Sequence, residues 1–426
     1  MSAPVAPLLE ELLRPLLSGM LPVRLTAWDG SVAGDPDGPR ITLNSPDALR
    51  RLLWHPGELG AAQAYVTGEL DVEDDIAAAL TQVRAAAAER GLTGARPRLA
   101  DLLRVLRGAA GLGVLGRPLP PPATQSQLRG RIHTPRRDRA AISHHYDLSN
   151  DFYALVLDPA MAYSCAYFTR NVPGTPRDPG YGIEQAQRDK LDLVCRKVGL
   201  GGPGMRLLDV GCGWGALSIH AAAEHNAQVV GVTISREQKA FADKRIAELG
   251  LSHRVEIRLQ DYREIPDGPF DAVTSLEMGE HVGEGNYPRY AQVLHDNAKP
   301  GARVLVQQMS RAGWHPGGGP FIESFIAPDM TMRPVGATVA LLERAGLEMR
   351  DVHSLREHYV WTVDAWLASL EARWSEVVAL VGVEMARVWR LYLVGGRLSF
   401  EQGRMGVDQL LAVRPTAGGS AAEELP

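Results

Sequence analysis

The sequence predicts an α/β fold in which helices cover both faces of a mostly parallel sheet, together with a smaller N-terminal domain. Three observations support this prediction. Apolar runs of strand length alternate with amphipathic helical segments between residues 205 and 309. A glycine-rich turn follows the first of these runs. The chain has 426 residues, too many for one ordinary hydrophobic core, so we expect two domains.

The composition indicates a globular protein. Hydrophobic residues make up 45% of the chain, charged residues 22%, and the net charge is −5, which is typical of a globular protein and not of one that coats nucleic acid. No apolar run is long enough to cross a bilayer, and Glu10 and Glu11 interrupt the stretch that a signal peptide would keep apolar. We therefore expect a cytoplasmic protein. Cys165, Cys195 and Cys212 are odd in number and form no CxxC pair, so we expect no metal site and no disulfide framework.

The first part of the chain predicts a small helical or mixed domain over residues 1–107. Ser45 is a good helix cap before an amphipathic segment, and a strong helix pattern over residues 74–90 ends at Gly91. Residues 108–140 are rich in glycine and proline and then basic, which is typical of a linker. We expect a catalytic domain over residues 141–415 and a disordered tail over residues 416–426.

The alternation in the second part predicts five strands and the helices between them. The strands are expected over residues 205–211, 227–235, 254–261, 270–278 and 302–309, and the helices over residues 216–225, 235–250 and 287–301. Ligands of such sheets bind beyond the carboxyl ends of the strands. Gln307 and Gln308 close the fifth apolar run, so we expect them to face a site.

The turn after the first strand carries the pattern G-x-G-x-G, with Asp209 before Gly211 and Gly213. The glycines let the backbone approach a ligand closely, and the next helix presents free N–H groups. A dinucleotide fingerprint would be G-x-G-x-x-G. The observed pattern resembles the start of class I S-adenosylmethionine (SAM) methyltransferases, which have a Rossmann-like fold; another α/β nucleotide site is the alternative.

Further cofactor contacts are expected at the ends of the next strands. The second strand ends without the acidic residue that usually binds the ribose, so Thr233 and Gln238 are expected to replace it. Asp261 is placed to accept a hydrogen bond from the adenine amine and Tyr262 to cover the ring, although Tyr262 as a packing aromatic is an alternative. The same pocket is expected to include Tyr163, Ser164, Ile234 and Leu276.

Several stretches together resemble the cyclopropane fatty acid synthases and mycolic acid methyltransferases. They are "HYDLSNDFYALVLDPAMAYSCAYF", "LLDVGCGWG", "GVTISREQ", "LQDYRE", "LEMGEHVGEGNY" and "HYVWTVDAW", in order over about residues 140–395. Residues 45–74 are similar to the N-terminal domain of bacterial phospholipid cyclopropane synthases, which the mycolic acid enzymes lack. The resemblance implies SAM as methyl donor and an unsaturated phospholipid acyl chain as acceptor.

The resemblance also implies a bicarbonate ion, held by protein groups, as the base of the reaction. Glu280 matches the family's glutamate at this ion, Tyr359 its tyrosine and Cys165 its cysteine, which acts through its backbone as much as its thiol. Glu280 is alternatively the base itself, with a raised pKa, or a plain acid at a helix start. Cys165 is alternatively a small buried residue. We expect His281 either to orient a neighbouring group or to pack in the core, and not to act in catalysis.

One position departs from the family pattern. Gln307 stands where family members carry a histidine, and an amide cannot become a cation or relay a proton. Bicarbonate should therefore be held less tightly, or the base replaced. This departure favours the branch of actinobacterial 10-methyl (tuberculostearic) fatty acid methyltransferases, with a methylene-branched product. A cyclopropane synthase, a methyltransferase of small molecules and a non-catalytic lipid-binding protein are the alternatives.

The expected partners follow from this substrate. We expect peripheral contact with the inner membrane face, for which the basic run at residues 129–137 and the helices of the N-terminal, membrane-associated domain (residues 1–107) are the candidates. The sequence shows no second dinucleotide motif, so saturation of a methylene product needs a separate reductase. We also expect a homodimer and no nucleic-acid partner.

Overall fold

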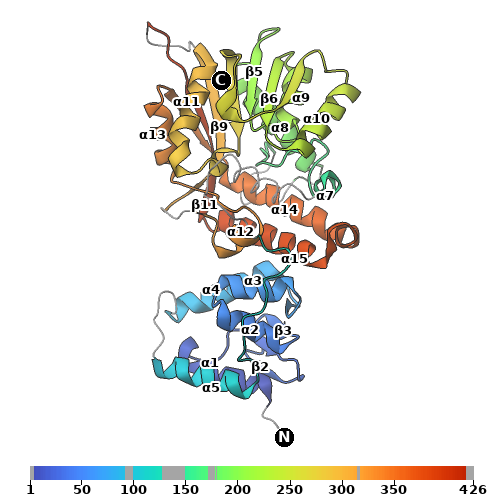
Figure 1. Cartoon of the computed structure of the whole chain (residues 1–426), viewed down its shortest axis with the longest axis vertical. Helices are drawn as coiled ribbons and strands as arrows, with labels where there is room; N and C mark the ends of the chain where they lie inside the picture. Colours follow the sequence, from blue (N-terminus) through green and yellow to red (C-terminus); the bar gives the residue numbers. More distant parts are fainter. Residues whose placement is uncertain are drawn as a thin grey trace. The chain divides into compact units, whose positions relative to one another are not determined.

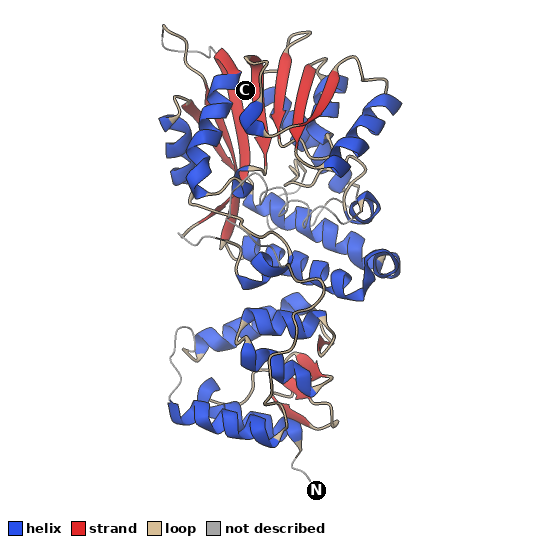
Figure 2. Cartoon of the chain, viewed as in Figure 1, coloured by secondary structure: helices blue, strands red, loops and turns tan. Residues whose placement is uncertain are grey.

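The structure is a computed structural model and describes residues 4–91, 99–126, 149–170, 178, 180–313 and 317–418 (Figures 1 and 2). It contains two compact units. The first comprises Met1–Gln125 and Val381–Gly395, and the second comprises Ser126–Leu380 and Gly396–Pro426. The basic run at residues 129–137 lies outside the described residues.

The first unit is a mixed α/β domain, in agreement with the sequence. Its elements are α1 (Val5–Leu17), β1 (Arg24–Thr26), β2 (Val32–Gly34), β3 (Arg40–Leu43), α2 (Pro46–Trp54), α3 (Glu58–Val66), β4 (Leu70–Val72), α4 (Ile76–Glu89) and α5 (Leu99–Gly111). The strands form one sheet in the order β2-β1-β3-β4. Ser45 caps α2 by accepting a hydrogen bond from the Asp47 N–H, as its sequence position predicts.

The second unit contains the alternating strands and helices. They are α7 (Asn150–Val156), α8 (Ile183–Lys197), β5 (Arg206–Val210), α9 (Ala216–Glu224), β6 (Gln228–Thr233), α10 (Arg236–Glu248), β7 (Val255–Leu259), η1 (Tyr262–Glu264), β8 (Phe270–Leu276), η2 (Gly279–His281), η3 (Glu284–Asn286), α11 (Tyr287–Asn297), β9 (Ala298–Arg311), α12 (Pro320–Phe325), α13 (Val335–Arg344), β10 (Glu348–Ser354), α14 (Arg356–Ala372), α15 (Trp374–Glu401) and β11 (Met405–Val413). Helix α15 also supplies Val381–Gly395 to the first unit.

One seven-stranded sheet organises this unit, in the order β10-β11-β9-β8-β5-β6-β7. The five strands predicted from the sequence are the parallel ones, β5 to β9. Strand β11 pairs antiparallel with β9 and β10 pairs antiparallel with β11, which the alternation did not indicate. The sheet is therefore mixed at one edge and parallel elsewhere.

Helices cover both faces of the sheet, as Figure 2 shows. Leu207 and Leu208 are adjacent in β5 and point to opposite faces. Leu207 belongs to a core formed with α8, α9 and α10, and Leu208 to a core formed with α11 and α13. The predicted architecture of a sheet between two helical layers is confirmed.

The predicted domain boundaries differ from the compact units. Helix α5 continues to Gly111, and Ala109 and Val114 are buried, so the start of the predicted linker at residues 108–140 packs into the first unit. Burial of apolar side chains outweighs the glycine-rich composition of this stretch. In the described part of the chain, no helix combines the length and apolar character that a bilayer crossing requires.

The paired glutamines of β9 face opposite layers. Strand β9 runs on to Arg311, so Gln307 is not at its end; however, Gln307 pairs with Leu276, the last residue of β8. Gln308 points to the other face, where it accepts a hydrogen bond from the Tyr287 hydroxyl at 2.5 Å and donates one to Thr338 Oγ1 at 3.0 Å. Gln308 therefore joins β9 to α11 and α13, and only Gln307 faces the site described below.

Replacing Gln308 by leucine should destabilise the second unit and spare the site. The variant leaves two buried hydroxyl groups, those of Tyr287 and Thr338, without this amide, which costs about 1–3 kcal/mol. Thermal unfolding followed by circular dichroism measures the loss. The substitution Gln292→Leu, at an exposed position of α11, is the matched control and should leave the midpoint unchanged. An unshifted midpoint for Gln308→Leu would contradict this role.

Candidate active site

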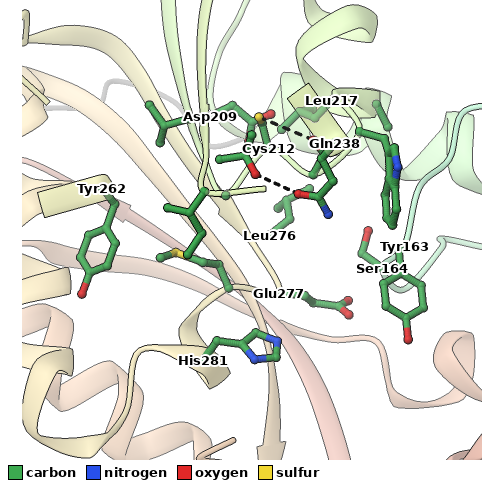
Figure 3. Close-up of a pocket in the computed structure, with 18 of the residues that line it drawn as sticks. Tyr163, Ser164, Asp209, Cys212, Leu217, Gln238, Tyr262, Leu276, Glu277 and His281 are labelled. Atoms are coloured by element: carbon green, nitrogen blue, oxygen red, sulfur yellow. Dashed lines mark hydrogen bonds between the residues drawn. The ribbon is translucent and has the colours of Figure 1, made fainter. Parts of the chain in front are cut away.

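A pocket lies at the carboxyl ends of β5, β6, β7 and β8 (Figure 3). It is where an α/β sheet is expected to bind its ligand. All of the cofactor residues predicted from the sequence line this one pocket: Tyr163, Ser164, Asp209, Gly211, Gly213, Thr233, Ile234, Gln238, Asp261, Tyr262 and Leu276. The structure therefore brings together residues that are spread over more than one hundred positions of the chain.

The glycine-rich turn forms one wall of the pocket. Gly213 has a φ of +54°, and a Cβ atom added to it would meet no atom within 4 Å. The backbone is thus open toward the pocket at this point, as a close ligand approach requires. Asp209 lies behind the turn and accepts a hydrogen bond from Ser218 Oγ at 2.8 Å. Burial raises the pKa of Asp209 to about 6.

The residues expected at the ribose, Thr233 and Gln238, hydrogen-bond to each other, whereas those expected at the adenine, Asp261 and Tyr262, have other partners in the fold. Thr233 donates to Gln238 Oε1 at 2.8 Å, which directs the amide N–H₂ of Gln238 away from this bond and leaves it to donate to a ligand hydroxyl. Both oxygens of Asp261 accept hydrogen bonds from Arg263. The ring of Tyr262 packs edge-on against Tyr290, which corresponds to the packing alternative.

Two residues of α8 that the sequence did not single out position the segment of Tyr163 and Ser164. Gln187 donates to the backbone oxygens of Ala162 and Ser164 at 3.1 and 2.8 Å. The Nζ of Lys190 donates to Ser164 Oγ at 2.6 Å, although Lys190 is only 1% exposed. Its burial lowers the pKa of Lys190, and the charge of Glu277 opposes that shift. A lysine in the middle of a helix gives no sequence signal of this role.

Glu277 is the residue on which the predicted catalytic groups converge. Its Oε1 accepts from the Cys165 backbone N–H at 2.7 Å and from Gln307 Nε2 at 2.8 Å. Its Oε2 accepts from the Tyr359 hydroxyl at 2.5 Å. Figure 3 shows the Glu277 side chain extending toward Tyr163. The structure thus brings Cys165, Gln307 and Tyr359 together as predicted, but around Glu277 and not around Glu280.

Gln307 is oriented by a partner on the neighbouring strand. Gln409 of β11 lies opposite Gln307, and its Nε2 donates to Gln307 Oε1 at 3.0 Å. The Gln307 amide therefore turns its N–H₂ toward the carboxylate of Glu277. Gln409 was missed because β11 itself was not predicted.

Glu280 lies nearby but outside the lining of the pocket. One of its oxygens accepts from the Met309 backbone N–H at 2.6 Å. Burial raises the pKa of Glu280 to about 8, and the carboxylate of Glu277 contributes in the same direction. Glu280 is thus protonated at neutral pH. His281 lines the pocket, and burial lowers its pKa to about 4, so its imidazole is neutral.

One sequence feature could have drawn attention to Glu277. It directly follows the apolar run of β8, and the structure places it at a φ of +50°, a conformation that a residue with a side chain rarely adopts. Such backbone strain concentrates at functional sites. The motif match to "GEHVG" drew attention instead to Glu280, three residues later.

A second cluster lies away from the pocket, between α8 and α9. The ligand atoms of Cys195, His220 and His225 are within 4.8 Å of one another, a proximity that the prediction of no metal site did not foresee. Burial raises the pKa of the Cys195 thiol, and both nitrogens of His225 are within hydrogen-bonding distance of Asp192 or the Leu200 carbonyl. These contacts hold His225, whereas Nε2 of His220 is buried and has no hydrogen-bond partner among the described residues.

Replacing Gly213 by valine should abolish binding of SAM. The new side chain would project into the open space of the pocket, at a backbone angle that valine tolerates poorly. Isothermal titration calorimetry measures the loss of binding. Gly250 follows α10 with a φ of +70° and an equally open Cβ direction, but it does not line the pocket.

The substitution Gly250→Val is therefore the matched control for backbone strain. It should bind SAM as the wild type does. If Gly213→Val binds SAM with wild-type affinity, the assignment of the pocket is wrong.

The substitution Glu280→Gln should change how stability depends on pH. A group whose pKa is raised on folding, here from 4.5 to about 8, stabilises the protein fully below the unfolded value, and this contribution is lost as the pH rises through the folded value. The wild-type melting temperature should therefore fall more steeply between about pH 5 and about pH 8 than that of the variant. Differential scanning fluorimetry provides the curves. Glu343→Gln, at an exposed site, should keep the wild-type slope; equal slopes for Glu280→Gln would contradict the raised pKa.

Comparison with known proteins identifies the family of the chain. The sequence profile of the family described as "Mycolic acid cyclopropane synthetase" matches residues 133–410. A probable fatty acid methyltransferase of Pseudomonas putida is 37% identical over 420 residues, which cover 97% of each chain. The tuberculostearic acid methyltransferase UfaA1 of Mycobacterium tuberculosis is 34% identical over 405 residues, covering 92% of this chain and 88% of the relative.

A solved structure resembles the second unit. Mycolic acid cyclopropane synthase CmaA1, in complex with SAH and CTAB, has a TM-score of 0.58 and 31% identity, and the match covers 65% of this chain and 98% of that chain. The pocket with its open glycine turn and the amide of Gln238 fits S-adenosylmethionine as the cofactor. The chain therefore belongs to the mycolic acid cyclopropane synthetase family and is an S-adenosylmethionine-dependent fatty acyl methyltransferase.

Proposed function

We propose that the enzyme methylates the double bond of an unsaturated acyl chain in a phospholipid and releases a methylene-branched chain. The observation that carries this proposal is the environment of Gln307, an amide that donates to a buried carboxylate where the family pattern has a histidine. The similarity to a tuberculostearic acid methyltransferase over 92% of the chain supports the same reading.

The reaction requires a dry and aromatic pocket. An isolated alkene is a weak nucleophile, so it has to be held against the methyl group in a site without water. SAM supplies that methyl group as part of a sulfonium cation. Beside Ser164, the ring of Tyr163 lies 5.3 Å from that of Trp366 and 6.5 Å from that of Trp214, and both tryptophans are almost fully buried. Aromatic faces of this kind stabilise a passing cation.

The product depends on when and where a proton is lost. Transfer of the methyl group to one alkene carbon leaves a positive charge on the other. Loss of a proton from the new methyl group at that stage closes a cyclopropane ring. A hydride shift from the methyl-bearing carbon moves the charge to that carbon, and proton loss from the methyl group then gives a methylene branch.

The titrating groups of the site favour the second course. Gln307 cannot take up a proton, and burial keeps the imidazole of His281 a weak base, with a pKa of about 4. The Tyr359 hydroxyl donates a hydrogen bond to the Glu277 carboxylate. Removal of the proton from the first cation is therefore slower than it would be beside a basic imidazole, which leaves time for the hydride shift.

Cyclopropane synthesis is the second candidate. The description of the matching family supports it, because it names cyclopropane synthetases. Both candidates share the cofactor, the acyl substrate and the first methyl transfer. They differ after the methyl transfer, because the methylene product needs a hydride shift before the proton is lost and the cyclopropane product does not.

The proposed reaction also implies a membrane surface and a second enzyme. An acyl chain in a phospholipid requires the enzyme to reach a membrane surface, and a methylene product requires a separate reductase before it becomes a methyl branch. Sedimentation with vesicles of anionic and of neutral phospholipid is the direct measurement of the first requirement.

The wild-type enzyme should convert oleoyl phospholipid mainly to a methylene-branched product. Gas chromatography with mass spectrometry of the fatty acid methyl esters separates this product from its cyclopropane isomer. A bacterial strain that lacks its own cyclopropane synthase and expresses the chain provides the lipids, and an empty vector is the control. Cyclopropane as the main product would overturn the proposed product and leave the family assignment intact.

A further inference from the structure

We infer that the carboxylate of Glu277 is the base of the reaction and occupies the place expected for a separate bicarbonate ion. The inference rests on the proposed function, because it concerns the proton lost in that reaction. It differs from the expectation drawn from the sequence, in which bicarbonate or Glu280 takes the proton.

The hydrogen bonds of Glu277 carry the inference. The groups that were expected to hold bicarbonate include Cys165, Tyr359 and the residue at position 307. In the structure, the Cys165 N–H, the Tyr359 hydroxyl and the Gln307 amide all donate to the Glu277 carboxylate, at 2.7, 2.5 and 2.8 Å. The planar carboxylate has the shape and charge of the ion that these donors would otherwise bind. The chain therefore carries its own anion at this position.

The backbone of Glu277 is built to hold the side chain there. Its N–H donates to the Gln307 carbonyl at 2.6 Å, immediately after β8 ends at Leu276. Its φ of +50° turns the side chain from the line of the strand. Gln409 fixes the rotamer of Gln307 from the other side. The strained backbone and the oriented amide together position the carboxylate at the pocket wall.

The charges around Glu277 support its role as a base. Burial raises the pKa of Glu277, whereas the Tyr359, Cys165 and Gln307 hydrogen bonds and the charge of Lys190 lower it. The pKa of Glu277 remains above its usual value, and the donors and the ammonium group of Lys190 limit that rise. Burial and the charge of Glu277 raise the pKa of the neighbouring Glu280 to about 8. The two carboxyl groups also differ in their partners, since three donors engage Glu277 and the Met309 N–H engages Glu280.

The carboxylate retains the capacity to take the proton. A carboxylate offers about four acceptor positions, and three are used by the donors named above. In the proposed step, a C–H bond of the transferred methyl group breaks, its electron pair forms the new C=C bond, and its proton passes to Glu277. The cationic chain and the anionic carboxylate are both neutralised, so charge and atoms balance without another reactant.

A bicarbonate ion in the same place does not fit these contacts. Its donors are already engaged, and a second anion beside the Glu277 carboxylate would add like-charge repulsion inside a buried site. The proton is therefore assigned to Glu277 and not to a bicarbonate ion.

The first test compares the wild-type rate with and without bicarbonate. Purified enzyme is assayed with SAM and vesicles of oleoyl phospholipid in buffer freed of carbon dioxide, and again with added bicarbonate. Turnover should agree between the two conditions within about twofold, since a tethered base needs no ion from solution. A rate that collapses without bicarbonate and returns with it would overturn the inference.

The second test uses two variants of Glu277 that differ in shape. Glu277→Gln keeps the side-chain volume without a base, and it should lower turnover by about 10²- to 10⁴-fold at all bicarbonate concentrations. Glu277→Gly removes the side chain at a backbone angle that glycine adopts freely and leaves the donors facing an open space. It should be inactive without bicarbonate and recover a saturable part of the rate when bicarbonate or formate is added. Wild-type turnover by Glu277→Gln would also overturn the inference.

A binding measurement gives a readout that does not depend on turnover. The line width of ¹³C-labelled bicarbonate in nuclear magnetic resonance should broaden with Glu277→Gly and not with the wild type. Calorimetric binding of SAM by both variants shows that the fold is intact. Broadening by the wild-type enzyme equal to that by Glu277→Gly would contradict the inference.

These results are separable from the proposed product. Ring closure and methylene formation both require the loss of a proton, so the base is identified by total turnover. The product is identified by chromatography. A wild-type enzyme that makes cyclopropane without bicarbonate would refute the product and retain Glu277 as the base.

Discussion

The buried carboxylate of Glu277 is the constraint on which the site depends. A charge at this depth is tolerated only when hydrogen-bond donors replace the water that it has lost. The donors come from three separate parts of the chain: Cys165 before α8, Gln307 in β9 and Tyr359 in α14. All three donors are needed together to stabilise the buried carboxylate. The carboxylate thus ties the strand edge, the segment that precedes α8 and the C-terminal helices into one chemical unit.

The antiparallel strands at the edge of the sheet also help to position the donors of Glu277. Strand β11 continues the sheet beyond the parallel strands and places Gln409 beside Gln307. Because side chains alternate along a strand, Gln307 and Gln308 point to opposite faces of the sheet and have different roles. Gln307 completes the site, and Gln308 connects β9 to Tyr287 and Thr338 in the helical layer on the opposite face. The same pair of amides therefore stabilises the fold and orients the chemistry.

The protonation states of the site follow from burial. His281 is kept neutral and Glu280 is kept protonated, because each would have to carry its charge without enough partners. Lys190 is also buried, but Ser164 and the nearby carboxylates stabilise its ammonium group.

The sequence by itself determined the five parallel strands of the sheet, the cofactor and many of the residues that line the cofactor pocket. These residues lie at the ends of locally recognisable strands, and parallel strands bring their carboxyl ends to one edge whatever else the fold contains. It also predicted Cys165, Gln307 and Tyr359 at one site, and the structure brings these three residues together. The tertiary structure decided the group on which they converge. Glu277 and Glu280 stand three residues apart with the same side chain, and only donors 112, 30 and 82 residues away, together with the positive φ of Glu277, distinguish the carboxylate that is held from the one that is protonated.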